Sequence, residues 1–182
     1  MKKKALIIGF GSIGRKHYNI LKKINEIGDI RILTQQKRIK NKIFNFEQAI
    51  KFNPDLIIIS STTNKHLYHL KIIEKNFKNK LVLVEKPLFD DYYKFKVKEN
   101  NVFIGYNFRF DPVIQFLKKK LNNKKLWSVN VICYSFLPEW RLNRDYTKTS
   151  SAKKRLGGGV LLDLSHELDY IQWLFGDIKI KY

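Results

Sequence analysis

Five short runs of apolar residues recur along the first 105 residues and predict the strands of a parallel sheet. These runs cover Lys4–Ile8, Ile30–Thr34, Leu56–Ser60, Leu81–Val84 and Val102–Gly105. Segments compatible with helices lie between the runs, and this alternation is typical of βαβ units with right-handed crossovers. The expected fold class is therefore α/β, with a parallel sheet that carries helices on both faces.

The pattern changes after Gly105. A helix is expected over Val113–Leu121, followed by a long strand-like run over Trp127–Phe136. A polar stretch without a period leads to an apolar, helix-like stretch that opens at Gly157 and ends at Gly176. We therefore divide the chain into two domains, residues 1–105 and residues 106–182, of which the second is a partial α/β domain that exposes apolar surface.

The first apolar run turns through glycines into a helical pattern, with the sequence ALIIGFGSIG from Ala5 to Gly14. In such a strand–turn–helix unit, Gly9 allows the tight turn, Gly11 lets a phosphate approach the backbone, and Gly14 lets the helix pack closely on the strand. The helix N-terminus offers N–H groups and a positive dipole end to a pyrophosphate. The loop predicts dinucleotide binding, with a plain tight turn in another α/β fold as the alternative.

A lysine follows the fourth predicted strand, in the segment Glu85-Lys86-Pro87. A dinucleotide binds at the edge where parallel strands end, so Lys86 is expected near the cofactor. The alternative is one more surface lysine. His17 and His69 are expected on helix surfaces.

The chain is strongly basic, with 36 Lys and Arg against 16 Asp and Glu and a formal net charge of +20. Only 7 of the basic residues are Arg, and the 29 Lys are scattered along the whole length. Surfaces that read bases or clamp phosphates favour the planar Arg fork. We therefore expect a solvated basic surface and no specific nucleic-acid partner.

Cys133 is the only cysteine, which excludes an internal disulfide and a cysteine metal cluster. It lies in an apolar run, where a small buried thiol is expected. No apolar stretch approaches the length of a membrane span, and the N-terminal run is too short for a signal peptide. These features predict a cytoplasmic protein without a membrane partner.

With Tyr106–Pro112 and the Gly157–Gly176 block added to these motifs, the chain resembles the glucose-fructose oxidoreductase and inositol dehydrogenase family (Gfo/Idh/MocA) over essentially its whole length. That family has an N-terminal Rossmann domain and a C-terminal α/β domain with a large open sheet. The resemblance implies an NAD(P)-dependent oxidoreductase that transfers a hydride between nicotinamide and a carbinol or ketone carbon. The implied substrate is a sugar, polyol or nucleotide sugar, and the implied full-length form is a homo-oligomer.

The resemblance also assigns cofactor residues, which lie in three loops. They are Gly9, Gly11, Ser12, Ile13 and Gly14 at the pyrophosphate, Ser61, Thr62, Asn64 and His66 after the third strand, and Glu85 and Lys86 beside the nicotinamide and its ribose. Thr63 departs from the family, which often has proline there.

Asp163 and His166 look like the family's Asp and His at the reacting carbon, and Asp169 like the acid that follows. In that reading His166 is the general base, Asp163 fixes its tautomer, and Lys86 stabilises alkoxide charge. Two residues separate Asp163 from His166 where many members have three, but an i,i+3 pair still shares a helix face. A core role for His166 and a capping role for Asp163 stay open, and no metal is expected.

Four residues are candidates for holding an anionic or cyclic substrate: Arg109, Trp140, Arg141 and Arg144. The loop after the second strand lacks the Asp or Glu that binds a ribose 2′-hydroxyl. Thr34, Lys37 and Arg38 stand there instead and favour a 2′-phosphate. The expected cofactor is NAD(P), with a preference for NADP.

Family members are generally much longer than this chain, so a C-terminally truncated second domain is expected. Two alternatives to an active oxidoreductase follow. The chain is a catalytically inactive remnant, or it is a module that only binds the dinucleotide.

Overall fold

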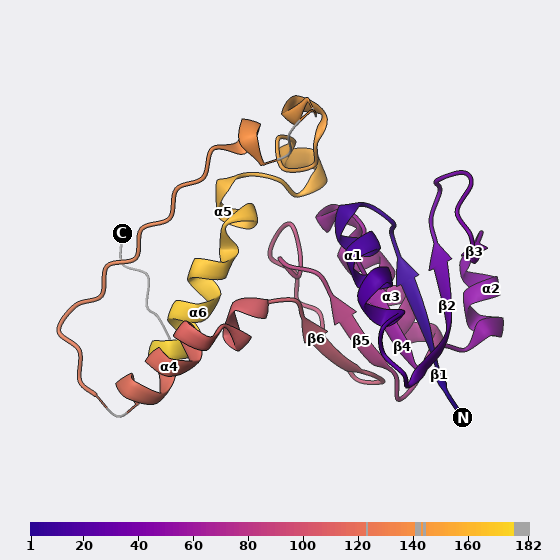
Figure 1. Cartoon of the computed structure of the whole chain (residues 1–182), viewed down its shortest axis with the longest axis horizontal. Helices are drawn as coiled ribbons and strands as arrows, with labels where there is room; N and C mark the ends of the chain where they lie inside the picture. The colour runs from indigo at the N-terminus through magenta and orange to yellow at the C-terminus, as the bar shows by residue number, and fades with distance from the viewer. Residues whose placement is uncertain (123, 141–142, 144, 177–182) are drawn as a thin grey trace. The chain divides into compact units, whose positions relative to one another are not determined.

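The computed structural model describes residues 1–122, 124–140, 143 and 145–176 (Figure 1). Two compact units form within it. The first comprises Met1–Gly105 together with Arg155–Gly157, and the second comprises the described residues of Tyr106–Lys154 and Gly158–Tyr182. None of the described helices is both long and apolar enough to cross a membrane.

The first unit is built on one sheet of six parallel strands. They are β1 (Lys3–Ile8), β2 (Ile27–Leu33), β3 (Lys42–Ile43), β4 (Leu56–Ile59), β5 (Leu81–Val84) and β6 (Asn101–Ile104). The order β3-β2-β1-β4-β5-β6 is that of a Rossmann fold, which confirms the expected fold class. Strand β3 was missed because two residues carry no periodic pattern.

Helices cover both faces of this sheet (Figure 1). On one face, α1 (Ser12–Leu21) packs Leu21 with Ala5, Ile7, Ile30 and Ile58. On the other, α2 (Phe46–Phe52) and α3 (His66–Asn76) contribute Ala49, Leu70 and Ile73 to a cluster with Leu6, Ile8, Ile57 and Ile59. Burial on both faces explains why β1 and β4 are continuous apolar runs rather than alternating ones.

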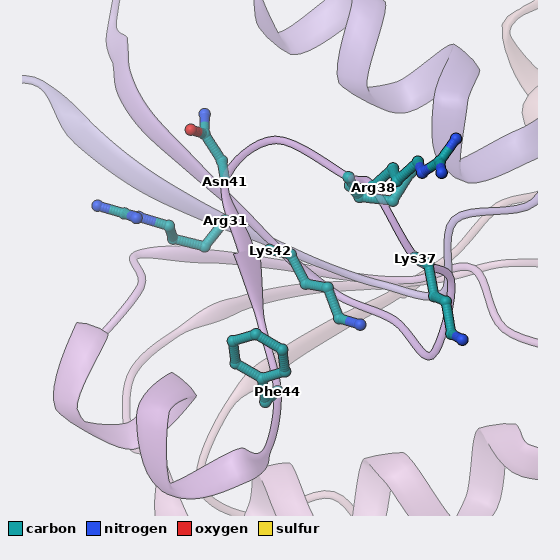
Figure 2. Close-up of a pocket in the computed structure, with 7 residues that line it drawn as sticks. Arg31, Lys37, Arg38, Asn41, Lys42 and Phe44 are labelled. Atoms are coloured by element: carbon teal, nitrogen blue, oxygen red, sulfur yellow. The ribbon is translucent and has the colours of Figure 1, made fainter.

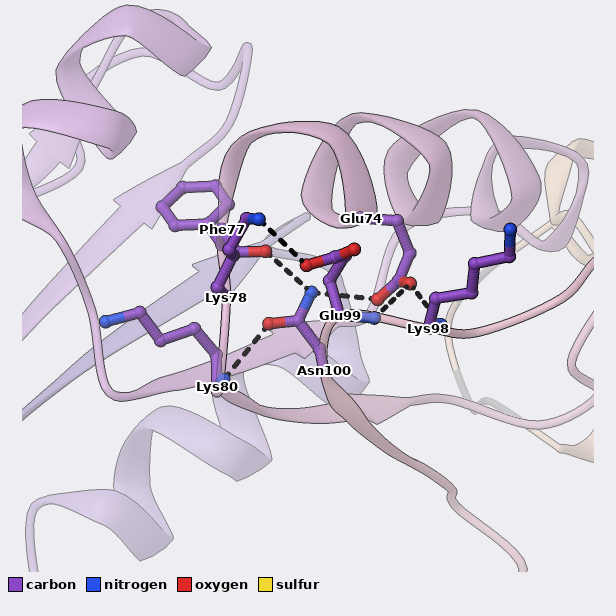
Figure 3. A network of polar contacts seen from close by, with 7 residues as sticks. All are labelled: Glu74, Phe77, Lys78, Lys80, Lys98, Glu99 and Asn100. Carbon is purple, nitrogen blue, oxygen red and sulfur yellow. Dashed lines mark hydrogen bonds and ion pairs between the residues drawn. The ribbon is translucent and has the colours of Figure 1, made fainter.

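The connection from β5 to β6 contains no helix, although helix-compatible segments were expected between all the strands. Lysines alternate with apolar residues from Lys94 to Lys98, and a period of two does not support a helix. Instead, Glu74 on α3 accepts the backbone N–H groups of Lys98 (2.7 Å) and Glu99 (3.0 Å) (Figure 3). This carboxylate satisfies backbone donors that a helix would have paired internally.

The regular secondary structure described in the second unit is helical. It contains α4 (Pro112–Leu121), α5 (Val160–Asp163), α6 (Ser165–Phe175) and the short 3-10 helices η2 (Asn107–Phe110), η3 (Leu137–Glu139) and η4 (Tyr146–Lys148). The expected helix near Val113–Leu121 is confirmed, and the Asp111 side chain caps it by accepting from the N–H groups of Val113 and Ile114.

Two expectations for the second unit are wrong. The run Trp127–Phe136 forms no strand in the described chain. A strand forms only where a neighbour takes up its backbone hydrogen bonds, and an alternating or apolar sequence alone does not supply one. Cys133, expected to be buried, is exposed for the same reason.

Candidate dinucleotide and active site

The loop between β1 and α1 has three glycines: Gly9 and Gly14 have no room for a side chain, and Gly11 faces open space. Gly9 has φ +91°, and a Cβ there would lie 2.6 Å from the backbone nitrogen of Ser61. A Cβ on Gly14 would clash with the carbonyl oxygen of Gly9. A Cβ on Gly11, the N-cap of α1, would meet no atom within 4 Å. The open space therefore lies at the helix N-terminus, where an anion is stabilised, and this fits a pyrophosphate.

The loop after β4 is tied to the glycine loop. The Ser60 hydroxyl donates to the Gly9 carbonyl oxygen at 2.9 Å. The Thr62 hydroxyl donates to Asn64 Oδ1 (2.7 Å), and Asn64 Nδ2 donates to the Arg155 carbonyl oxygen (3.0 Å). The hydroxyl of Ser61 lies 3.0 Å from His69 Nδ1 on α3.

His66 lies inside the core rather than at a ligand-facing surface, with 1% of its surface exposed. Its Nδ1 is 3.1 Å from the Pro87 carbonyl oxygen and 3.2 Å from that of Leu88, and its Nε2 is 3.1 Å from that of Ser61. Burial lowers the pKa of His66, although contacts with these carbonyl oxygens act in the opposite direction. The ring therefore joins two loops that the sequence assigned to the cofactor.

Glu85 and Lys86 follow directly on β5, and both are partly buried. The Glu85 carboxylate lies 2.6 Å from Nε2 of His17 on α1. The expectation that His17 covers a helix surface is therefore wrong. Its position three residues after Gly14 was the available clue, because i,i+3 residues share a helix face and Gly14 faces the sheet.

The loop after β2 is organised by Gln36, which the sequence did not single out. Its Nε2 donates to the Phe10 carbonyl oxygen (2.8 Å), and its Oε1 accepts from Arg15 Nη2 (3.0 Å). Thr34 is buried, and its hydroxyl accepts the N–H of Gln36 at 3.2 Å. The hydroxyl of Thr34 thus serves the loop itself.

Lys37 and Arg38 are exposed and line a hollow of about 530 Å³ together with Arg31 and Lys42 (Figure 2). The other lining residues are Ile39, Asn41 and Phe44, so no carboxylate faces the hollow. Arg31 is paired with Asp29 at 3.1 Å, and the remaining cations Lys37, Arg38 and Lys42 favour an anionic ligand.

In the second unit, His166 lies among aromatic rings. It stacks on Phe108 with ring centroids 4.4 Å apart at 16°, and it meets Tyr106 edge-on at 5.8 Å and 81°. The helix breaks at Leu164, so Asp163 is the last residue of α5 and His166 is the second residue of α6, and the two do not share one continuous helix. The i,i+3 argument from the sequence therefore does not apply.

Asp163 is held in place by its own surroundings. Its Oδ1 accepts from the Ser151 hydroxyl and its Oδ2 from the Gly159 N–H, both at 3.1 Å. The residue at the N-cap of α6 is Leu164, so Asp163 does not cap that helix. The described residues contain no group of three or more His, Cys, Asp or Glu side chains arranged for a metal ion.

The proposed substrate residues have different surroundings. Arg109 donates through Nε (2.9 Å) and Nη2 (2.6 Å) to Asp169, a bidentate pair that ties η2 to α6. The Trp140 indole N–H donates to the Ser135 hydroxyl. Arg141 and Arg144 lie outside the described residues.

The chain was compared with family models, curated proteins and solved structures. No family model matches the chain. A curated relative, an uncharacterized oxidoreductase of Synechocystis, is 27% identical over 141 residues, which cover 73% of this chain and 38% of the relative.

Among solved structures, the WlbA dehydrogenase of Chromobacterium violaceum in complex with NADH and UDP-GlcNAcA has a TM-score of 0.76 and 18% identity, covering 96% of this chain and 56% of that chain. The myo-inositol 2-dehydrogenase of Lactobacillus plantarum has a TM-score of 0.72 and 20% identity, covering 97% and 57%. The chain thus spans little more than half of these structures. They are dehydrogenases of the Gfo/Idh/MocA type, and this chain has their fold.

Proposed function

We propose that this chain binds a nicotinamide dinucleotide and belongs to an NAD(P)-dependent oxidoreductase that acts on a CH–OH group. The observation that carries the proposal is the open space at Gly11, at the N-terminus of α1, between two glycines that packing requires. The proposed substrate is a sugar, polyol or nucleotide sugar. Support for this class comes from the neighbours, whose structures include complexes with UDP-GlcNAcA and with scyllo-inositol.

In the proposed reaction the bound nicotinamide supplies the hydride acceptor or donor. Lys86 holds the substrate oxygen and stabilises the negative charge that develops on it. His166 accepts the hydroxyl proton, and the stacked Phe108 ring keeps the imidazole in one orientation. Asp163, anchored by Ser151 and Gly159, is proposed to orient His166. In the reverse direction the same groups return the proton to a ketone oxygen.

The binding proposal is tested by Gly11→Val. The Gly11 φ of −72° is ordinary for any residue, and an added Cβ meets no protein atom within 4 Å, so the fold should keep its thermal midpoint. The side chain fills the space expected for the phosphate, and calorimetry should show at least about a tenfold loss of dinucleotide affinity. Asn19→Val, on an exposed position of the same helix, is the matched control and should bind as wild type does. Equal affinity in wild type and Gly11→Val would exclude the loop from the binding site.

The proposal includes a preference for NADPH over NADH, supported by Lys37, Arg38 and Lys42 around the hollow of Figure 2. Lys37→Ala and Arg38→Ala should each weaken NADPH binding more than NADH binding, because only NADPH carries the 2′-phosphate. Isothermal titration with both cofactors measures the ratio. Lys40→Ala, an exposed lysine of the same loop that does not line the hollow, is the control. A preference for NADH that neither variant alters would show that these cations do not read the 2′ position.

A further inference from the structure

The two motifs that define the cofactor site meet through one pair of side chains. His17 lies on α1, the helix whose N-terminus closes the glycine loop, and Glu85 begins the Glu85–Pro87 segment. The His17 Nε2 and Glu85 Oε1 atoms are 2.6 Å apart, and the two side chains are only 19% and 20% exposed. A contact this short, shielded from solvent, holds its two elements together more firmly than a surface ion pair does.

Packing leaves the Glu85 side chain little choice of position. A Cβ on Gly105, directly after β6, would lie 3.3 Å from Glu85 Oε2, so the absence of a side chain at Gly105 makes room for the carboxylate. The Glu85 backbone is fixed as well, because its N–H donates to the Ile59 carbonyl oxygen at 2.9 Å. The space beside Gly105 and the fixed backbone thus hold the Glu85 carboxylate next to His17.

The other side of Lys86 is held by a second histidine. His66 lies within 3.2 Å of the Pro87 and Leu88 carbonyl oxygens. Lys86 is thus flanked in the chain by Glu85, which α1 holds, and by Pro87, which α3 holds. A lysine side chain is long and flexible, so fixing the backbone on both sides restricts where its amino group can reach.

We propose that His17 is a positioning residue that acts through Glu85 to fix Lys86 against the nicotinamide half of the dinucleotide. This proposal rests on the proposed function. It follows that His17 contributes to the affinity for the nicotinamide half and not to that for the adenosine diphosphate half, which the glycine loop binds.

The experiment compares two ligands that share the adenosine diphosphate half: NADH, and ADP-ribose, which lacks the nicotinamide. The ratio of the NADH affinity to the ADP-ribose affinity isolates the contribution of the nicotinamide half. Neither ligand carries a 2′-phosphate, so this ratio does not depend on the preference at the 2′ position. His17→Phe keeps the ring shape and removes the polar contact, and should reduce this ratio roughly 3- to 10-fold, the net effect of one ordinary hydrogen bond. His17→Gln places an amide N–H near the position of Nε2 and should restore the ratio. Asn19→Ala, an exposed position of α1, should leave it unchanged.

Glu85→Gln keeps a hydrogen-bond acceptor in the same place but removes the negative charge. This second variant tests the same contact in case His17→Phe lowers the thermal midpoint of the protein. It should shift the ratio in the same direction, and the effects of Glu85→Gln and His17→Phe should not add, because both act on one contact. An unchanged ratio in both variants, or additive effects, would overturn the role of His17. Failure of wild type to bind either ligand would instead overturn the proposed function.

Discussion

At the scale of single residues, the histidines of the first unit make more buried contacts than the sequence indicated. His69 was expected on a helix surface, yet its ring lies 3.0 Å from the Ser61 hydroxyl and contacts the rings of Phe46 and Tyr68. Burial, together with the neighbouring His66 and Lys65, lowers the pKa of His69 to about 4. The folded protein therefore keeps this ring neutral at pH values where an unfolded chain protonates it.

The difference between the folded and unfolded pKa of His69 predicts that the folded protein loses stability in mild acid. The folded pKa of His69 lies below its unfolded value of 6.5, so its contribution is fully present above pH 6.5 and is lost as pH falls towards about 4. Denaturant unfolding at pH 7 and at pH 4.5 should show a drop in the free energy of unfolding that is smaller in His69→Phe. Phenylalanine suits the aromatic surroundings and does not titrate. An identical drop in the variant would mean that His69 does not titrate differently on unfolding.

At the scale of elements, the β5–β6 connection depends on side-chain hydrogen bonds, whereas helices α1, α2 and α3 form the connections β1–β2, β3–β4 and β4–β5. Asn100 is 8% exposed and makes three hydrogen bonds: from Nδ2 to Glu74 Oε1 (2.8 Å) and to the Phe77 carbonyl oxygen (2.9 Å), and at Oδ1 from the Lys80 N–H (3.0 Å) (Figure 3). Burial alone would raise the pKa of Glu74, but the N–H groups of Lys98, Asn100 and Glu99 outweigh it and lower the pKa. The network fixes both the end of α3 and the start of β6.

Asn100→Ala should therefore destabilise the fold. It leaves a buried backbone carbonyl and a backbone N–H without their partner, which costs on the order of 1–3 kcal/mol in the free energy of unfolding. Urea denaturation measures this, and hydrogen exchange should show faster exchange at the Lys80 N–H. Asn101→Ala, the exposed neighbour in β6, is the matched control and should change stability by less. Equal effects of the two substitutions would remove the special role of Asn100.

At the scale of the whole molecule, the two units differ in how they treat apolar side chains. The first unit has an apolar core between its sheet and helices, although Phe44, Tyr92 and Phe103 are exposed. The second unit exposes apolar side chains, as expected for residues 106–182, with Trp127 at 93%, Tyr134 at 90% and Val160 at 78%. Large exposed apolar side chains in one part of a protein indicate a surface for interaction.

The proposed chemistry draws on both units, because Lys86 belongs to the first and His166 to the second. Where turnover is measured, Lys86→Ala and His166→Ala should each lower kcat by about 10²- to 10⁴-fold, the usual effect of losing acid–base assistance. Lys86→Ala should also weaken dinucleotide binding, whereas His166→Ala should leave it unchanged. Lys71→Ala, an exposed lysine of α3, is the control for a general charge effect. A near-normal kcat in His166→Ala would move the base to another residue, and Tyr106, which meets the His166 ring edge-on, is the next to test.

The sequence by itself determined the parallel sheet and the glycine loop. Apolar runs at strand length and a glycine at a positive φ are local constraints, so they can be read without knowing what packs against them. The tertiary structure alone decided the side-chain pairs that join distant segments. His17 and Glu85 are 68 positions apart, and Arg109 and Asp169 are 60 apart. Such pairs depend on which strand ends and helix faces the fold brings together. The same reason explains Trp127–Phe136, whose sequence is suited to a strand but whose described surroundings offer no neighbour to complete one.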